Sequence, residues 1–189
     1  AHANPLVTVT EGALLPGDSL VATATGSVTD VSDTHAGNNA IASGYKIMHG
    51  TEDVTANYAI TTVAGTLTIN PKAVTVTAQD KAFIYTGAAQ SWDKYDVTGL
   101  VGTDALTAVV EGSITFPSES PVVNEVKSHT FTTGTPGNYT VSYVNGELTM
   151  TNAQVAITIT AASQGWTYDG NAHANPLVTV TEGALLPGD

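Results

Sequence analysis

The side chains best suited to metal binding or acid–base chemistry are five histidines. Zinc sites hold their ligands at short, recurring spacings, and no two of these histidines have such a spacing. His2 and His173 even occupy the same position of a sequence repeat. We therefore expect solvent-exposed loop residues, and no metal site, at all five positions: His2, His35, His49, His129 and His173.

Two groups of carboxylates offer oxygen ligands for calcium, a hard cation that takes several of them. The first group is Asp18 with Asp30 and Asp33, and the second is Glu52 with Asp53. Neither group has the dense D-x-D-x-D-G spacing of a single-loop calcium site. Solvated loop carboxylates are the favoured interpretation, and calcium binding is the alternative.

Aromatic side chains could stack on a sugar or fill a core. Trp166 and Tyr168 are two residues apart, on one face of an expected strand, and Phe83 and Tyr85 stand at the equivalent positions of a second repeat. Because the ring type changes between the copies, we interpret all four as core residues. Trp92 and Tyr95 have no such counterparts and are the better candidates for an exposed patch.

A lysine could form an isopeptide bond with an asparagine, but only if both are buried beside a carboxylate. The lysines do not recur in register between the repeats, so we expect ordinary surface residues. Asn138-Tyr139-Thr140 matches a glycosylation sequon, a tripeptide that is common by chance. The five lysines are Lys46, Lys72, Lys81, Lys94 and Lys127.

The chain contains no G-x-S-x-G elbow, P-loop or dinucleotide-binding glycine pattern. We therefore expect no enzymatic activity, with no catalytic, cofactor-binding or metal residues and no cofactor. The formal net charge is -12, which repels nucleic-acid phosphates and anionic lipids. No apolar run reaches the length of a membrane span, so neither nucleic-acid binding nor membrane insertion is expected.

The elements that must position these side chains are organised by repeats. Residues 1–18 are identical to 172–189, which gives a period of 171 residues (172 − 1). Within it, residues 156–170 match 73–87, and 57–69 match 138–150. This indicates alternating modules A and B of an array. We assign 1–72 to the C-terminal part of module A, 73–155 to a complete module B, and 156–189 to the N-terminal part of the next module A.

The local patterns predict strands almost everywhere. Val74 and Val76 alternate with threonines, as do Ile157 and Ile159, so one face of each strand is expected in the core. The Asn145-Gly146 dipeptide predicts a type I′ hairpin that joins strands 139–144 and 147–150. Residues 105–110 fit either a strand or one helical turn, and no longer amphipathic helix is evident.

The order of these motifs resembles the MBG and YDG repeats of bacterial surface adhesins. The matching residues are WTYDG (166–170), TGLVGTDAL (98–106) and the segment from Asn57-Tyr58 through GTLTINP (65–71). Module B departs from the pattern with Tyr85-Thr86-Gly87, and module A has Leu14-Leu15-Pro16 where Gly-Leu-Val is expected. The resemblance implies a mainly β module, sometimes of β-grasp type, that stacks in stalks on the cell surface and has no enzymatic activity.

We therefore expect an all-β, mainly antiparallel fold of tandem small modules in an elongated array, with β-grasp-like α+β modules carrying one short helix as the alternative. The expected function is a structural stalk repeat of an extracellular bacterial adhesin, with a ligand-binding module for glycan or host protein as the alternative. The expected partners are neighbouring repeats of the same chain. Since module B separates the two parts of module A, head-to-tail self-association is also expected, with 153–189 of one chain completing 19–70 of the next.

Overall fold

The computed structural model describes residues 1–189, which form two compact units. Each unit is assembled from separate stretches of the chain. The first contains Ala1–Val74, Gly99–Leu106 and Phe131–Ser142, and the second contains Thr75–Thr98, Thr107–Thr130 and Tyr143–Asp189. This division into compact units does not test the module boundaries at 72/73 and 155/156 that the sequence repeat predicts, and they stay a prediction.

Strands and short turns make up all the regular structure, and the only helices are four 3-10 turns of three residues each. The all-β prediction is therefore confirmed, and the β-grasp alternative with a short helix does not hold. No helix has the length and apolar character that crossing a membrane requires. The turns are η1 (Val31–Asp33), η2 (Thr55–Asn57), η3 (Pro117–Glu119) and η4 (Pro136–Asn138).

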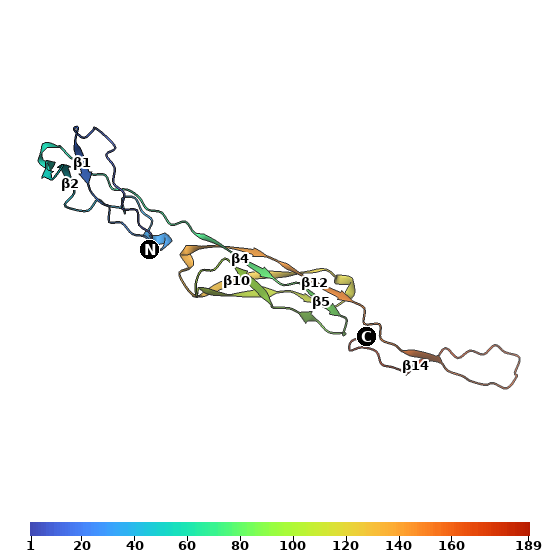
Figure 1. Ribbon diagram of the computed structural model, residues 1–189. Coiled ribbons are helices and arrows are strands. Elements are labelled where there is room, and N and C mark those ends of the chain that lie inside the picture. The colour runs from blue at the N-terminus through green and yellow to red at the C-terminus, as the bar shows by residue number, and fades with distance from the viewer. The chain divides into compact units, whose positions relative to one another are not determined.

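In the first part of the chain, three short strands form one antiparallel sheet in the order β1-β2-β3. Figure 1 shows β1 and β2 side by side in this part of the chain. Isolated bridges join His2 to Val28 and Asn39 to Gly65. The three strands are β1 (Asp18–Val21), β2 (Lys46–His49) and β3 (Glu52–Asp53).

The strands from Lys72 to Thr151 form two main sheets, with the orders β5-β12-β10-β8 and β11-β4-β7, and a small β6-β9 pair. Pairing is antiparallel between β4 and β7, β10 and β12, and β6 and β9, and parallel between β5 and β12. The bounds are β4 (Lys72–Ala78), β5 (Lys81–Ile84), β6 (Gln90–Ser91), β7 (Tyr95–Thr98), β8 (Ala105–Glu111), β9 (Ser113–Ile114), β10 (Val122–Thr133), β11 (Tyr139–Val144) and β12 (Gly146–Thr151).

The alternation predicted for β4 is confirmed, because Val74 and Val76 are fully buried while Thr75 and Thr77 are half-buried. In the second unit, Ile114, Leu148 and Met150 form a buried cluster. Phe83, Tyr85, Trp92 and Val122 pack against it. Residues 105–110, which fit either a strand or a helical turn, belong to strand β8.

The predicted hairpin at Asn145-Gly146 is wrong, because β11 and β12 belong to different sheets. Gly146 has no positive φ; it is buried, and a Cβ there would lie 2.7 Å from the carbonyl oxygen of Ala78. Asn145 uses its side-chain oxygen to accept from the backbone N–H of Val126 at 3.0 Å. The dipeptide therefore moves the chain from one sheet to the other, and the glycine is needed for close backbone contact.

The last part of the chain contains only the antiparallel pair β13 (Thr158–Ala161) and β14 (Val178–Glu182). Every residue of the two strands is exposed. The predicted burial of Ile157 and Ile159 is therefore wrong in this structure: the two side chains are 38% and 61% exposed. Each strand is paired on one edge only, with the other strand, and no second layer covers the pair.

Candidate functional site

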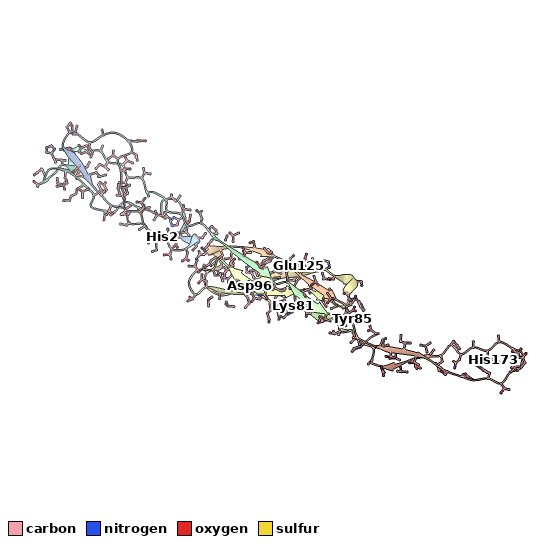
Figure 2. The ribbon with its side chains drawn as sticks, turned by 45° about the vertical axis from the view of Figure 1, so that its right-hand side comes forward. His2, Lys81, Tyr85, Asp96, Glu125 and His173 are labelled. Carbon is pink, nitrogen blue, oxygen red and sulfur yellow. The ribbon has the colours of Figure 1, made fainter.

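The histidines do not gather at one place, and the structure contains no group of three or more His, Asp or Glu side chains arranged to hold a metal ion. His49 Nδ1 lies 2.6 Å from Asp18, and His173 Nε2 lies 2.9 Å from Asp169. The prediction of an exposed loop residue is wrong for His129, which is half-buried in β10 and lies 2.6 Å from the Tyr143 hydroxyl. Figure 2 shows His173 in the long loop between β13 and β14.

The four aspartates of the two candidate calcium groups each have a protein partner. Asp18 accepts from Tyr58, Asp30 accepts from Asn138, and Asp33 accepts from two backbone N–H groups. Asp53 pairs with Lys46 at 3.1 Å and accepts from Thr55, and these contacts lower the pKa of Asp53 to about 2, with the Thr55 hydroxyl as the largest cause. These carboxylates hold parts of the fold in place.

The predictions for the aromatic residues divide between the two repeats. Phe83 and Tyr85 are half-buried against the core, as expected. Their counterparts are not buried: Trp166 is 44% exposed and stacks on His173, and Tyr168 is 95% exposed. Trp92, which was the candidate for an exposed patch, packs on the core with the Lys81 ammonium 4.5 Å above its ring.

Tyr95 is half-buried in β7, so the pair with Trp92 makes no exposed aromatic patch. None of the five lysines is buried, as the sequence led us to expect. Lys46, Lys94 and Lys127 each form an ion pair with a nearby carboxylate. No lysine therefore has the burial that an isopeptide bond requires.

One hydrogen-bonded pair recurs at equivalent positions of both repeats. The Tyr58 hydroxyl donates to Asp18 and accepts from the backbone N–H of Leu15 at 2.9 Å. In the other repeat, the Tyr139 hydroxyl donates to Asp104 at 2.5 Å and accepts from the N–H of Val101 at 3.2 Å. The carboxylate raises the pKa of each tyrosine, and the tyrosine and His49 lower the pKa of Asp18.

A second recurring feature closes the turns η1 and η3. Asp33 accepts from the backbone N–H groups of Thr29 and Asp30 at 2.7 and 3.0 Å, and Glu119 does the same with Thr115 and Phe116 at 2.7 and 3.0 Å. These backbone donors lower the pKa of both carboxyl groups. The two halves of the sequence thus build the same local geometry from residues 86 positions apart (119 − 33).

Asn138 links a turn of one predicted module to a turn of the other within the first unit. Its side-chain NH₂ donates to Asp30 at 2.5 Å, and its side-chain oxygen accepts from the N–H of Val31 at 2.8 Å. Both polar atoms of the amide are therefore used in holding η1 against η4. The sequence indicated only a chance sequon at this position.

The Tyr85-Thr86-Gly87 segment makes a similar link within the second unit. The Tyr85 hydroxyl donates to Asp189 at 2.6 Å, and this carboxylate raises the pKa of Tyr85. Gly87 has φ +78°, and a Cβ there would overlap the carbonyl oxygen of Pro187. Figure 1 shows the chain returning after β14 to end beside this region, and Figure 2 labels Tyr85 there. The segment thus holds the Pro-Gly-Asp turn of the following repeat.

The first unit also contains an open groove of about 870 Å³. Its two walls are residues 6–14 and 58–65, and Leu20, Ile41 and Ile47 also line it. Neither wall has strand structure apart from the single bridge at Gly65. Apolar side chains are exposed along both walls, among them Leu6, Val9, Ile60 and Val63.

The links made by Asn138 and Tyr85, and the groove, were not found from the sequence. The only signal for Tyr85 was the recurrence of the Tyr-x-Gly pattern, which we assigned to core packing. The partners of both residues lie about 100 residues away along the chain, so no local pattern could reveal them. The groove depends on which strands are paired, and sequence periodicity does not give pairing.

These side chains join segments of the protein to one another. No curated protein and no solved structure matches the chain. The profile of one family, described as the MBG domain (YGX type), matches residues 74–149. The resemblance to MBG and YDG repeats that the sequence motifs indicated is therefore confirmed for residues 74–149, the part of the chain that this profile covers.

Proposed function

We propose that this chain is a structural stalk repeat of a large bacterial surface adhesin, and that it projects a distal domain from the cell without enzymatic activity. The MBG match over residues 74–149 supports a surface-protein repeat. The observation that carries the stalk proposal is the link from Tyr85 and Gly87 to the Pro187–Asp189 turn, because it joins a repeat to the one that follows.

A stalk must resist bending at the joints between its repeats. The first joint has only Asn70-Pro71-Lys72 between the matched segments, and proline fixes one backbone torsion there. Asn138 adds a two-point hydrogen-bonded link to η1. In our proposal these links keep successive repeats in line, and the net charge of -12 keeps neighbouring stalks apart in the extracellular medium.

The alternative is a ligand-binding adhesin module. The exposure of Trp166 and of Tyr168 favours it, since carbohydrate sites use exposed aromatic faces. A glycan-binding screen with the whole chain separates the two functions. A stalk gives no saturable binding, whereas saturable binding that Tyr168→Ala abolishes would establish the alternative.

The stalk proposal is tested by small-angle X-ray scattering on polypeptides of one, two and three 171-residue periods. The maximum dimension is expected to increase linearly with the number of periods. In a compact particle the maximum dimension grows only with roughly the cube root of the mass. Growth of that kind would contradict the proposal.

The Tyr85 link is tested in the same polypeptides. Tyr85→Phe removes the hydroxyl and keeps the ring, so we expect the scattering to show greater flexibility between repeats, with unchanged thermal stability. Tyr143→Phe is the matched control, because that hydroxyl contacts His129 of the same repeat. Equal flexibility in the two variants would exclude a role for Tyr85 in stiffening the array.

A further inference from the structure

We propose that the turn η1, together with Asp30 before it, is a docking surface that selects which module follows it, and that its occupant is the η4 turn of a B module. The two turns contact each other through the side-chain amide of Asn138. Its NH₂ donates to Asp30 at 2.5 Å, and its oxygen accepts from the N–H of Val31 at 2.8 Å. The inference rests on the module array of the proposed function and adds a rule for the order of the modules.

Module B contains a turn, η3, that has the same backbone contacts as η1. In each turn one carboxylate accepts from two backbone N–H groups, Asp33 in η1 and Glu119 in η3. These shared contacts align the two turns at an offset of 86 residues (119 − 33). At this offset, the equivalent residues are Asp30 with Phe116 and Val31 with Pro117.

Neither contact of the asparagine amide can form at η3. Phe116 has no carboxylate to accept a hydrogen bond, and Pro117 has no N–H to donate one. The asparagine itself does not differ between the modules, because Asn57-Tyr58 of module A matches Asn138-Tyr139 of module B. The choice of neighbour therefore lies in the turn, and only the turn of module A can bind both polar atoms of the amide.

The contact at η1 is sheltered and includes a charged group. Asp30, Val31 and Asn138 are each half-buried. A hydrogen bond to a carboxylate is stronger than one between neutral groups, and the second bond fixes the orientation of the amide. The pair of bonds therefore favours one docked arrangement of η4 over others.

Module B places η3 beside a different contact with the module that follows it. The centroids of the Phe116 and Tyr85 rings lie 6.1 Å apart, and the Tyr85 hydroxyl donates to Asp189 at 2.6 Å. An aromatic pair thus stands at the B–A joint, where the A–B joint has a polar contact. Because the two joints differ in chemistry, alternation of A and B is favoured over a run of B modules.

Exchange of the turn sequences within the full chain tests this selection. The first variant gives η1 the sequence of η3 and keeps a closing carboxylate, by Asp30→Phe, Val31→Pro and Asp33→Glu. The backbone N–H of Asn138 donates to the Thr135 carbonyl at 3.0 Å within η4. We expect this N–H to exchange with deuterium about fivefold faster in the variant, because the net stabilisation of roughly one hydrogen bond no longer holds η4 against η1.

The reverse variant is the matched control. It gives η3 the sequence of η1, by Phe116→Asp, Pro117→Val and Glu119→Asp. The exchange rate at Asn138 should equal that of the unmodified chain, because the partners of its side chain are unchanged. An unchanged rate in the first variant, or an equal increase in both variants, overturns the proposal.

A second test restores the contact with its partners exchanged. Asn138→Asp alone places a carboxylate against Asp30, so the N–H of Val31 should exchange about fivefold faster. Adding Asp30→Asn again sets an amide opposite a carboxylate, and the rate at Val31 should return to that of the unmodified chain. Hydrogen exchange reports this one contact and scattering reports the length of the array, so failure here leaves the stalk proposal standing. An unchanged rate at Val31 in the single variant, or no recovery in the double variant, contradicts direct selection by η1.

Discussion

At the residue scale, the Tyr58–Asp18 pair explains how a nearly buried carboxylate is tolerated in the first unit. The Asp18 side chain is 7% exposed and contacts both the Tyr58 hydroxyl and His49. The tyrosine hydroxyl also accepts from the N–H of Leu15, so the pair fixes the chain on both sides of the Pro16-Gly17 turn. The same contacts at Tyr139 and Asp104 indicate that the pair belongs to the module fold.

The pair predicts loss of stability at both ends of the pH scale. The Tyr58 hydrogen bond, followed by His49, lowers the pKa of Asp18, so its contribution is present above the ordinary aspartate pKa of about 4 and is lost as the pH falls below it. Asp18 raises the pKa of Tyr58, so that contribution is present below about 10 and is lost as the pH rises further.

Thermal unfolding followed by near-ultraviolet circular dichroism measures this profile. Tyr58→Phe should lower the melting temperature at neutral pH. It should also reduce the dependence of the melting temperature on pH at both the acidic and the alkaline end of the profile. Tyr168→Phe is the control, since Tyr168 is 95% exposed, and its profile should match that of the unmodified chain. Identical profiles for all three proteins would show that the pair does not contribute to folding.

At the element scale, the step from β11 to β12 determines how the two sheets are joined. Gly146 lies against the backbone of Ala78 and Gln79, at the end of β4, and pairs with Asn124 of β10. Three strands thus meet at one glycine, and a side chain there would have to displace backbone atoms. The absence of a Cβ at this position is what lets the two sheets approach.

Gly146→Ala should therefore destabilise the fold by about 1–3 kcal/mol, the usual cost of overpacking against backbone. Gly137→Ala is the matched control, because nothing lies within 4 Å of its Cβ position and its φ is not positive. It should change the free energy of unfolding by no more than about 0.5 kcal/mol. Urea unfolding curves of the two variants decide the point, and equal stability would refute the role of Gly146.

The same elements show which features the sequence could predict. The valine–threonine alternation of β4 was enough to identify a strand and its buried face, because burial on one side imposes a period of two. The hairpin prediction from Asn-Gly failed because that dipeptide describes a local turn. The glycine at position 146 is required instead by the close approach of the Ala78 and Gln79 backbone, which is distant in the sequence. The prediction for Trp166 and Tyr168 failed for a related reason. Their counterparts Phe83 and Tyr85 pack on the cluster of Ile114, Leu148 and Met150, whereas Trp166 and Tyr168 are 44% and 95% exposed.

At the scale of the whole molecule, the net charge makes separate copies of the chain repel one another. Each chain carries a formal net charge of -12, with five lysines against 17 acidic residues. The strength of this repulsion should depend on how well salt screens the copies from each other.

We predict that the repulsion between copies weakens as sodium chloride is raised from about 0.05 to about 0.5 M, because the Debye length falls well below about 10 Å. The second virial coefficient from static light scattering gives the comparison: it should be positive at low salt and decrease as salt is added. A coefficient that rises with salt would mean that net charge does not govern how the copies interact.

The two identical eighteen-residue ends have different backbone structures. Val178–Glu182 is a paired strand, and the same five amino acids at 7–11 form none. A rule that assigns secondary structure from local sequence must assign the same structure to both copies, and that assignment is wrong for one of them. Pairing with a neighbouring strand therefore decides whether this segment is a strand, and its own residues only permit it.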